Sequence, residues 1–214
     1  MVPSILLNKI VIASNNPGKL RELQALLAPL GIEALAQSDF HVVEAEEPHG
    51  TFLENALAKA RNASRATGLP ALADDSGLCV PSLAGAPGVH SAHFAGKAGR
   101  REERDARNNA KLVAALAQHS DRAAFYYCVL VLLRSHEDAT PIVADGYWHG
   151  EIVLEPRGTG GFGYDPYFLT GSGRTAAQLS AGEKNRESHR ARALAALAAK
   201  LRQLPAAPSS EGRG

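Results

Sequence analysis

The chain has 214 residues, of which 45% are hydrophobic and 21% are charged, and its 23 basic and 22 acidic side chains give a formal net charge of +1. This composition is typical of a soluble globular protein, and the chain is long enough to bury a core without stabilising disulfide bonds or metals. A charge so close to neutral provides no broad cationic surface, which argues against nucleic acid or an anionic membrane as the main partner.

No apolar run approaches the roughly 20 residues that cross a bilayer, and Ser4, Asn8 and Lys9 interrupt the apolar residues near the N-terminus. The two cysteines, Cys79 and Cys128, each lie within an apolar run, which is more typical of buried thiols than of a disulfide. We therefore expect a cytoplasmic protein without a membrane anchor.

The first predicted unit is a strand, a loop and a helix. Residues 9–13 (KIVIA) predict a short buried strand, the polar turn SNNPGK occupies 14–19, and residues 20–30 have leucines at helical spacing. Asn16 is a suitable helix cap, and Pro17 suits a first helical turn.

The second helix is marked at both ends, by the capping box of Thr51 and Glu54 and by the closing Gly68. Residues 71–80 (ALADDSGLCV) predict a strand that enters a carboxylate-bearing turn and leaves it again. Residues 81–96 are too rich in glycine and proline for a regular element, so we expect a site loop there.

The second half of the chain continues the alternation of helices and strands. A helix is predicted over 102–118, a central strand over 123–133 (AAFYYCVLVLL), and a strand or hairpin over 141–153. Residues 157–168 form a glycine-dense loop.

A single final helix is predicted over 180–203, opened by a capping box of Ser180 and Glu183. The alternating elements predict an α/β fold, with residues 1–204 as one domain and residues 205–214 as a disordered tail.

The turn at 14–19 is the first candidate site. A polar turn between a buried strand and a helix start exposes backbone N–H groups and the positive end of the helix dipole, where anions bind. Lys19 and Arg21 add positive charge, but the spacing is not that of a P-loop. The residues alone therefore fit either an anion-binding loop or a simple capped helix start.

Asp74 and Asp75 are the second candidate site, because they follow an apolar run and precede Ser76 and Gly77. Adjacent carboxylates with partial burial favour a nearby cation or a bound proton. Mg²⁺ needs only one or two carboxylates when it also bridges to phosphates. A turn in which the carboxylate and the hydroxyl cap backbone N–H groups explains the same residues.

Three other clusters have competing interpretations. The acidic group of Glu44, Glu46 and Glu47 is typical of a solvated face near a helix start. The aromatic residues of the glycine-rich run 158–166 fit stacking on a base or inward packing. The basic cluster at 184–192 fits several donors to one ligand or a solvated helix face.

Taken together, these segments resemble the inosine triphosphate pyrophosphatase family, also called the non-canonical purine nucleotide pyrophosphatases. The resemblance covers residues 9–202 and rests on five stretches, which are weak singly and very specific jointly. They are SNNPGKLREL, GTFLENALAKAR, LADDSGLCVPSLAGAPGVHSAHFAG, GTGGFGYDPYF and EKNRESHRARAL.

The resemblance implies an elongated, bilobed α/β fold with a twisted mixed β-sheet, flanking helices and a central substrate cleft. It implies hydrolysis of inosine, deoxyinosine and xanthosine triphosphates to the monophosphate and pyrophosphate. This reaction requires Mg²⁺ and clears deaminated purines from the nucleotide pool. Members of the family are commonly homodimers.

The resemblance also assigns site residues. Asp75 would be the general base and a metal ligand, Asp74 would support it at the metal site, and Glu46 or Glu47 would be a further ligand. The implied substrate-binding residues are Ser14, Asn15, Asn16, Pro17, Gly18 and Lys19 on the triphosphate, Ser76, and Phe162, Gly163, Tyr164, Asp165, Lys184, His189 and Arg190 on the nucleoside or phosphates.

One stretch departs from the family pattern. Where members often have G-x-Y-S-A-R-[YF], this chain has His90, His93 and Phe94. A histidine at position 93 makes a weaker contact than arginine, and one that is charged only below about its reference pKa of 6.5.

Two other functions fit part of the same pattern. A nucleotide-sensing module would need the phosphate loop and the pocket but no poised Asp75. A related pyrophosphatase would act on modified pyrimidine or methylated nucleotides. RNA binding is disfavoured, because the chain has no basic stripe interleaved with aromatic residues.

Overall fold

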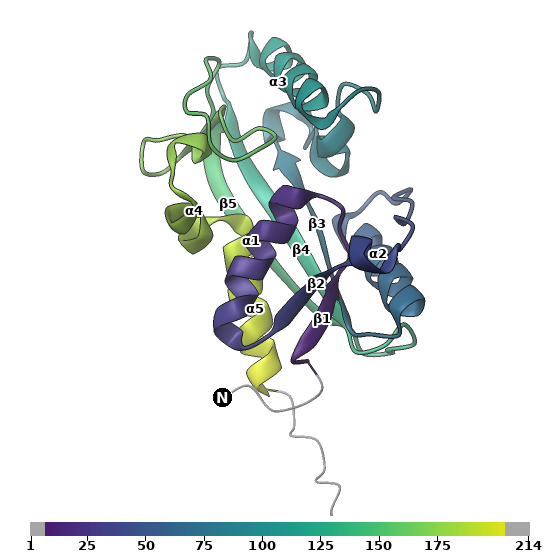
Figure 1. Cartoon of the computed structure of the whole chain (residues 1–214). Coiled ribbons are helices and arrows are strands. Elements are labelled where there is room, and N and C mark those ends of the chain that lie inside the picture. The colour runs from purple at the N-terminus through teal and green to yellow at the C-terminus, as the bar shows by residue number, and fades with distance from the viewer. Residues whose placement is uncertain (1–6, 204–214) are drawn as a thin grey trace, which may run out of the picture.

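The computed structural model describes residues 7–203 and shows a mixed α/β protein built on one six-stranded sheet with the order β2-β1-β3-β4-β5-β6 (Figure 1). Strand β1 is parallel to β2 and β3, and the remaining neighbours are antiparallel. The strands are β1 Lys9–Ile12, β2 Glu33–Ala36, β3 Ala71–Cys79, β4 Ala123–Leu133, β5 Ile142–Ile152 and β6 Phe168–Thr170.

Five α-helices accompany the sheet in the described residues. They are α1 Pro17–Leu27, α2 Phe52–Thr67, α3 Arg101–Leu116, α4 Ala181–Glu187 and α5 His189–Gln203. Short 3₁₀-helices lie at Ala28–Leu30, Gln37–Phe40, Pro81–Leu83, Gly88–His93 and Ala176–Gln178. None of the helices within residues 7–203 is long and apolar enough to cross a membrane.

The long strands β3, β4 and β5 connect two parts of the molecule. Figure 1 shows them running from a lower lobe, which carries α1, α2 and α5, to an upper lobe, which carries α3. In the lower lobe, alternate residues of β4 face opposite sides of the sheet. Cys128, Leu130 and Leu132 pack with α1 and α5, and Val129, Val131 and Leu133 pack with α2. A separate apolar cluster, which includes Leu112, Tyr126, Trp148 and Phe168, forms the core of the upper lobe.

The predicted helix caps are confirmed. The side-chain oxygen of Asn16 accepts hydrogen bonds from the backbone N–H groups of Gly18 and Lys19, at 2.9 and 3.1 Å. Thr51 caps α2 by accepting from the N–H of Glu54 at 3.2 Å. The strand 123–133 is central, as predicted, because β3 and β5 pair with its two edges.

Residues 71–80 do not contain the predicted turn. Residues 71–79 form one continuous strand of nine residues, in which Asp74 lies opposite Leu130 and Asp75 lies opposite Val129. Two buried carboxylates are compatible with a strand interior here because cations from other segments contact both of them.

The single final helix predicted over 180–203 is also wrong, because the chain breaks at Ser188. This residue has extended backbone angles, and its hydroxyl accepts from the N–H of Ala191 at 3.2 Å, so it begins a new helix. The two edge strands, β2 and β6, were not predicted; they have four and three residues. The predicted tail at 205–214 lies outside the described residues, and the single domain over 1–204 stays a prediction.

Helix α5 lies directly against β5, and Gly146 makes this contact possible. A Cβ atom on Gly146 would lie 2.4 Å from the carbonyl oxygen of His189 and 2.5 Å from the backbone nitrogen of Ala193. We expect Gly146→Ala to lower the free energy of unfolding by about 1–3 kcal/mol, because the backbone of α5 must move. Urea denaturation measures this change.

Gly171→Ala is the matched control for this prediction, since a Cβ atom there meets no other group within 4 Å. Equal stability of the two variants would contradict the close packing of α5 on β5.

Candidate active site

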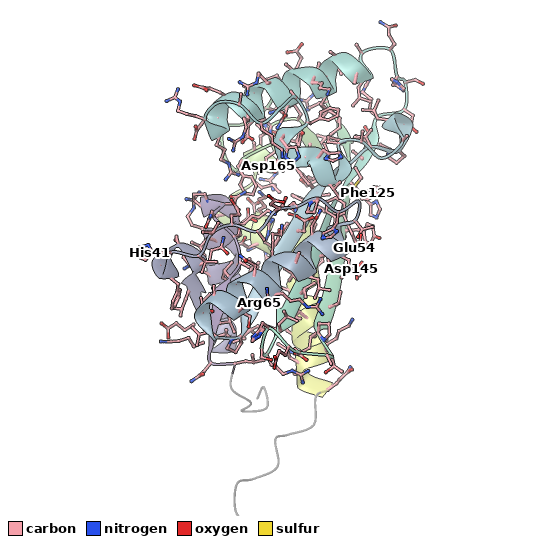
Figure 2. All side chains as sticks on the ribbon, turned by 90° about the vertical axis from the view of Figure 1, so that its right-hand side faces the viewer. His41, Glu54, Arg65, Phe125, Asp145 and Asp165 are labelled. Atoms are coloured by element: carbon pink, nitrogen blue, oxygen red, sulfur yellow. The ribbon has the colours of Figure 1, made fainter. Side chains whose placement is uncertain are left out.

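A cavity of about 790 Å³ opens where the two lobes meet, and Figure 2 shows Asp165 at this level. Its walls come from segments that are distant in the sequence: the loop after β1, residues 44–47, the middle of β3, the start of α3, the glycine-rich loop and the α4–α5 junction. All the predicted site residues line it except Gly18 and Asp74.

The loop at 14–19 forms one wall of the cavity. The backbone N–H of Asn16 donates to the Ser14 hydroxyl at 3.2 Å, and the amide of Gln37 donates to the side-chain oxygen of Asn15 at 2.9 Å. Gly18 lies behind the loop, where an added Cβ atom would lie 2.6 Å from the ring of Phe162. A glycine is therefore needed at position 18 for the loop at 14–19 to approach the ring of Phe162.

Asp74 lies beneath the cavity floor, with a completely buried side chain. One carboxylate oxygen accepts from Lys19 Nζ at 2.6 Å and Ser76 Oγ at 2.8 Å. The other accepts from Arg190 Nε at 2.7 Å and Cys128 Sγ at 3.2 Å. Burial favours the neutral acid, but the charges of Arg190 and Lys19 more than offset it and hold the pKa of Asp74 well below its usual value.

The role of Asp74 as a metal ligand stays a prediction, and the structure places this residue beneath the cavity lining. Both of its oxygens are already occupied by protein donors, and the side chain does not reach the cavity. Asp74 fixes the positions of Lys19 and Arg190.

Asp75 faces the cavity and has one engaged and one free oxygen. Its Oδ1 accepts from Lys59 Nζ at 2.6 Å, whereas its Oδ2 is buried and has no hydrogen-bond partner in the described part of the chain. Burial raises the pKa of Asp75 even though Lys59 lies beside it. A buried carboxylate oxygen without a donor is a suitable acceptor for a proton or a ligand for a cation.

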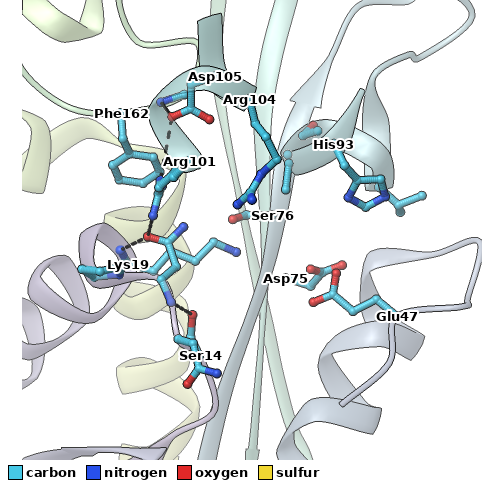
Figure 3. Close-up of a pocket in the computed structure, with 18 of the residues that line it drawn as sticks. Ser14, Lys19, Glu47, Asp75, Ser76, His93, Arg101, Arg104, Asp105 and Phe162 are labelled. Atoms are coloured by element: carbon cyan, nitrogen blue, oxygen red, sulfur yellow. Dashed lines mark hydrogen bonds and ion pairs between the residues drawn. The ribbon is translucent and has the colours of Figure 1, made fainter. Parts of the chain in front are cut away.

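Glu47 joins this group through the same lysine, because its Oε1 lies 2.8 Å from Lys59 Nζ. Burial opposes ionisation of Glu47, but Lys59 more than compensates and lowers the pKa of the carboxyl. Glu46 also lines the cavity but has no comparable link to Asp75. Figure 3 shows Asp75 and Glu47 facing each other.

Oxygen donors of this kind fit Mg²⁺, which commonly uses one or two carboxylates together with substrate phosphates. The free Oδ2 of Asp75 and the Glu47 carboxylate form such a pair. Within residues 7–203, no group of three or more histidine, cysteine or acidic side chains is arranged to hold a metal by itself.

The glycine-rich loop and α4 meet at Asp165. Its Oδ2 accepts from Lys184 Nζ at 2.6 Å and from the backbone N–H of Phe162 at 2.9 Å, and its Oδ1 accepts from the Tyr126 hydroxyl at 3.2 Å. Lys184 Nζ lies 4.7 Å above the centre of the Phe162 ring. This network fixes the ring and the ammonium group together.

His189 and Arg190 begin α5 behind that network. The His189 ring stacks on Tyr126 with a centroid distance of 4.7 Å, and its Nδ1 is buried with no partner among the described residues. Burial and the adjacent Arg190 hold the pKa of His189 well below its usual value, so the imidazole is neutral at pH 7. Glu22 contacts both Arg190 and Lys184.

The chain is similar to known proteins over almost its whole length. Residues 10–200 match the Ham1 family. The chain belongs to this family. It is 60% identical to a dITP/XTP pyrophosphatase of Ralstonia nicotianae over 197 residues, which are 92% of this chain and 98% of that protein. It is 61% identical to a dITP/XTP pyrophosphatase of Bordetella pertussis, with 92% of each chain covered.

Solved structures agree with this assignment. A HAM1 protein from Coxiella burnetii is 48% identical with a TM-score of 0.82, and covers 92% of this chain and 99% of its own. The Staphylococcus aureus Ham1 protein is 37% identical with a TM-score of 0.77, and covers 90% and 97%. The predicted family and the mixed α/β class are thereby confirmed.

Several residues of the cavity wall in this Ham1 chain were not predicted from the sequence. Lys59 has a detectable signal, because it interrupts the apolar face that Ala56, Ala60 and Ala63 form on α2. Glu22 has no such signal, since its partners lie more than 160 residues away in α4 and α5.

The first turn of α3 also enters the cavity, where Figure 3 shows Arg101, Arg104 and Asp105 above Lys19 and Ser76. The sequence shows the dense charge of residues 101–105 (REERD). It does not show that this segment lies across the cavity from the lower lobe. Asp105 accepts from the backbone N–H of Gly163 at 3.0 Å, which ties α3 to the glycine-rich loop.

Proposed function

We propose that this protein hydrolyses non-canonical purine nucleoside triphosphates, among them ITP, dITP and XTP, to the monophosphate and pyrophosphate. Curated relatives that are 59–61% identical carry the name dITP/XTP pyrophosphatase. The observation that carries the proposal is the free, buried Oδ2 of Asp75, which faces the same cavity as the loop at 14–19 and the Phe162 ring.

The phosphate chain would lie between the loop and Asp75. The N-terminus of α1 and the Lys19 ammonium group both favour an anion there. Cleavage between the α- and β-phosphates places negative charge on the departing pyrophosphate, so the main requirement is positioning and charge neutralisation. Lys19 and Ser76, which line the cavity, would contribute to this positioning.

Asp75 would act as the general base. Its raised pKa makes it a better proton acceptor than an exposed aspartate, and Lys59 fixes its orientation through Oδ1. Asp75 and Glu47 would hold Mg²⁺, which supplies further positive charge against the phosphates when it is bound.

The base would lie beside Phe162, Lys184 and Arg190. Hypoxanthine and xanthine present an acceptor at O6 and a donor at N1, whereas adenine presents the reverse. The cationic donors of Lys184 and Arg190 favour an O6 acceptor, and Phe162 offers a ring for stacking. Guanine shares O6 and N1–H with hypoxanthine, so it is the more demanding competitor.

A substrate panel tests this function. ITP, XTP, ATP and GTP are each incubated with and without Mg²⁺, and monophosphate, pyrophosphate and orthophosphate are measured separately. We expect pyrophosphate from ITP and XTP only with Mg²⁺, and a kcat/KM for ATP that is lower by about 10⁴, because the wrong base leaves buried donors unpaired.

Other outcomes of this panel would contradict the proposal or support one of the alternative functions. Equal hydrolysis of all four nucleotides contradicts the proposed selectivity, and orthophosphate as the first product contradicts the proposed reaction. Tight binding without turnover supports a nucleotide sensor. Faster cleavage of modified pyrimidine or methylated nucleotides, added to the panel, supports the related pyrophosphatase.

The remaining parts of this function are proposals of the same kind. We propose a homodimer with a small purine nucleotide as its ligand, in the cytoplasm, with neither nucleic acid nor a membrane as partner. The cleft between the two lobes would be the substrate cleft of the family.

A further inference from the structure

The cavity-lining cations of α1, α2, α4 and α5 are already neutralised by carboxylates. Each of the four that line the cavity forms an ion pair of 3.0 Å or less with at least one acidic side chain. The cations are Lys19, Lys59, Lys184 and Arg190, and their partners are Asp74, Asp75, Asp165, Glu22 and Glu47. A polyanion that enters the cavity therefore meets little uncompensated positive charge from below.

The uncompensated positive charge of the cavity comes from the upper lobe. Lys97 and Arg104 line the cavity there without an ion pair among residues 7–203, whereas Arg101, which also lines it, pairs with Asp105. Arg104 donates to the carbonyl oxygen of Gly99 at 2.9 Å and makes no ion pair in the described part of the chain. Figure 3 shows its side chain extending from α3 into the open space above Ser76 and Asp75.

Arg101 is engaged differently, although it lies one turn before Arg104. It donates to the side-chain oxygen of Asn16, its guanidinium carbon lies 4.8 Å from the centre of the Phe162 ring, and its Nε lies 3.8 Å from Asp105. Arg101 thus holds the loop at 14–19 and the ring of Phe162 in place.

Other titratable groups of the upper lobe do not change this balance. Burial and Lys97 lower the pKa of His93, which is therefore neutral at pH 7. Glu102 and Asp105 also line the cavity, but neither forms an ion pair with Arg104 among residues 7–203. Arg104 is thus a permanent cation that is available to a ligand.

We propose that Arg104 binds the phosphates that leave as pyrophosphate, across the cleft from Lys19, and that Arg101 is a positioning residue beside it. This inference rests on the proposed function. In the proposed function the nucleoside would lie beside Phe162, next to Arg101, and Arg104 lies one turn further along α3, towards Asp75 and Glu47. A guanidinium group in that place fits two oxygens of a polyphosphate.

The test compares Arg104→Gln with Arg107→Gln. Both substitutions remove one arginine charge from α3, but Arg107 does not line the cavity and instead donates to the carbonyl oxygen of Ala98. We expect Arg104→Gln to raise KM for ITP and the inhibition constant of inorganic pyrophosphate about tenfold each, because a charge-assisted hydrogen bond is lost.

The pattern of effects separates ligand binding from a structural role. The inhibition constant of inosine monophosphate should stay unchanged in Arg104→Gln, Arg107→Gln should behave as the wild type, and Arg104→Lys should recover part of the pyrophosphate affinity. Equal pyrophosphate inhibition constants in the two glutamine variants would overturn the inference, as would a matching loss of affinity for the monophosphate.

Calorimetric titration with pyrophosphate and Mg²⁺ repeats the comparison without turnover. If the wild type releases no pyrophosphate from any nucleotide, the proposed function fails. The titration still tests whether Arg104 binds pyrophosphate. If the wild type is active and the two variants bind pyrophosphate alike, only the inference about Arg104 fails.

Discussion

Asp75→Asn is expected to lower kcat for ITP by a factor of about 10²–10⁴ while it retains nucleotide binding. The amide cannot accept a proton at the free, buried oxygen position that Asp75 Oδ2 occupies. Lys59 keeps Glu47 as an ion-pair partner in this variant, so the fold should be maintained. Single-turnover kinetics measure the loss of rate, and calorimetry with ITP measures the binding.

Glu46→Gln is the matched control, because Glu46 lines the same cavity but is not linked to Lys59. We expect it to change kcat much less than Asp75→Asn does. If a folded Asp75→Asn protein turns over ITP at the wild-type rate, Asp75 is not the base. Glu47→Gln then shows whether the other carboxylate on Lys59 takes this role.

The largest expected effect on stability comes from Asp74→Asn, which should lower the free energy of unfolding by about 3–5 kcal/mol. The substitution removes a charge that Lys19 and Arg190 contact at 2.6 and 2.7 Å, and Arg190 is only 1% exposed. The buried guanidinium group of Arg190 has lost its hydration, and in this variant it keeps only Glu22 as a counter-charge. Urea denaturation measures the change at pH 7.

A surface pair provides the control. Glu33→Gln removes the partner of Lys9 in an ion pair whose side chains are 58% and 49% exposed, and it should cost about 0–1 kcal/mol. Equal losses in the two variants would contradict the idea that burial makes the Asp74 network important.

The same network predicts a dependence on pH. Because the folded protein holds the pKa of Asp74 well below the value of the unfolded chain, about 3.9, the stabilisation is complete above that value. It is lost as the pH falls below about 4 towards the folded pKa. The wild type should therefore lose more stability between pH 5 and pH 2 than Asp74→Asn does, and denaturation at several pH values measures the difference.

Local signals accounted for much of the fold. Asn16 and Thr51 cap helices through contacts within three residues, so the sequence pattern alone was sufficient to find α1 and α2. The apolar run at 123–133 likewise has the composition of a central strand, whatever its neighbours are.

The errors arose where the outcome depends on distant contacts. Asp74 and Asp75 look like turn residues locally, and only cations from α1, α2 and α5 make them compatible with a strand interior. Ser188 looks like an ordinary helical residue, and its role at the start of α5 appears only in the folded chain. For the same reason, the sequence identified the segments of the site better than their mutual contacts.

The close approach of Gly18 to Phe162 has an evolutionary consequence. One residue sits in the loop that would hold the phosphates, the other forms the ring beside the base, and there is no room for even a methyl group between them. A mutation that enlarges the loop at this point must also displace the ring. In the proposed function, the loop beside the phosphates and the ring beside the base are in contact, so selection on position 18 would act through both ends of the ligand.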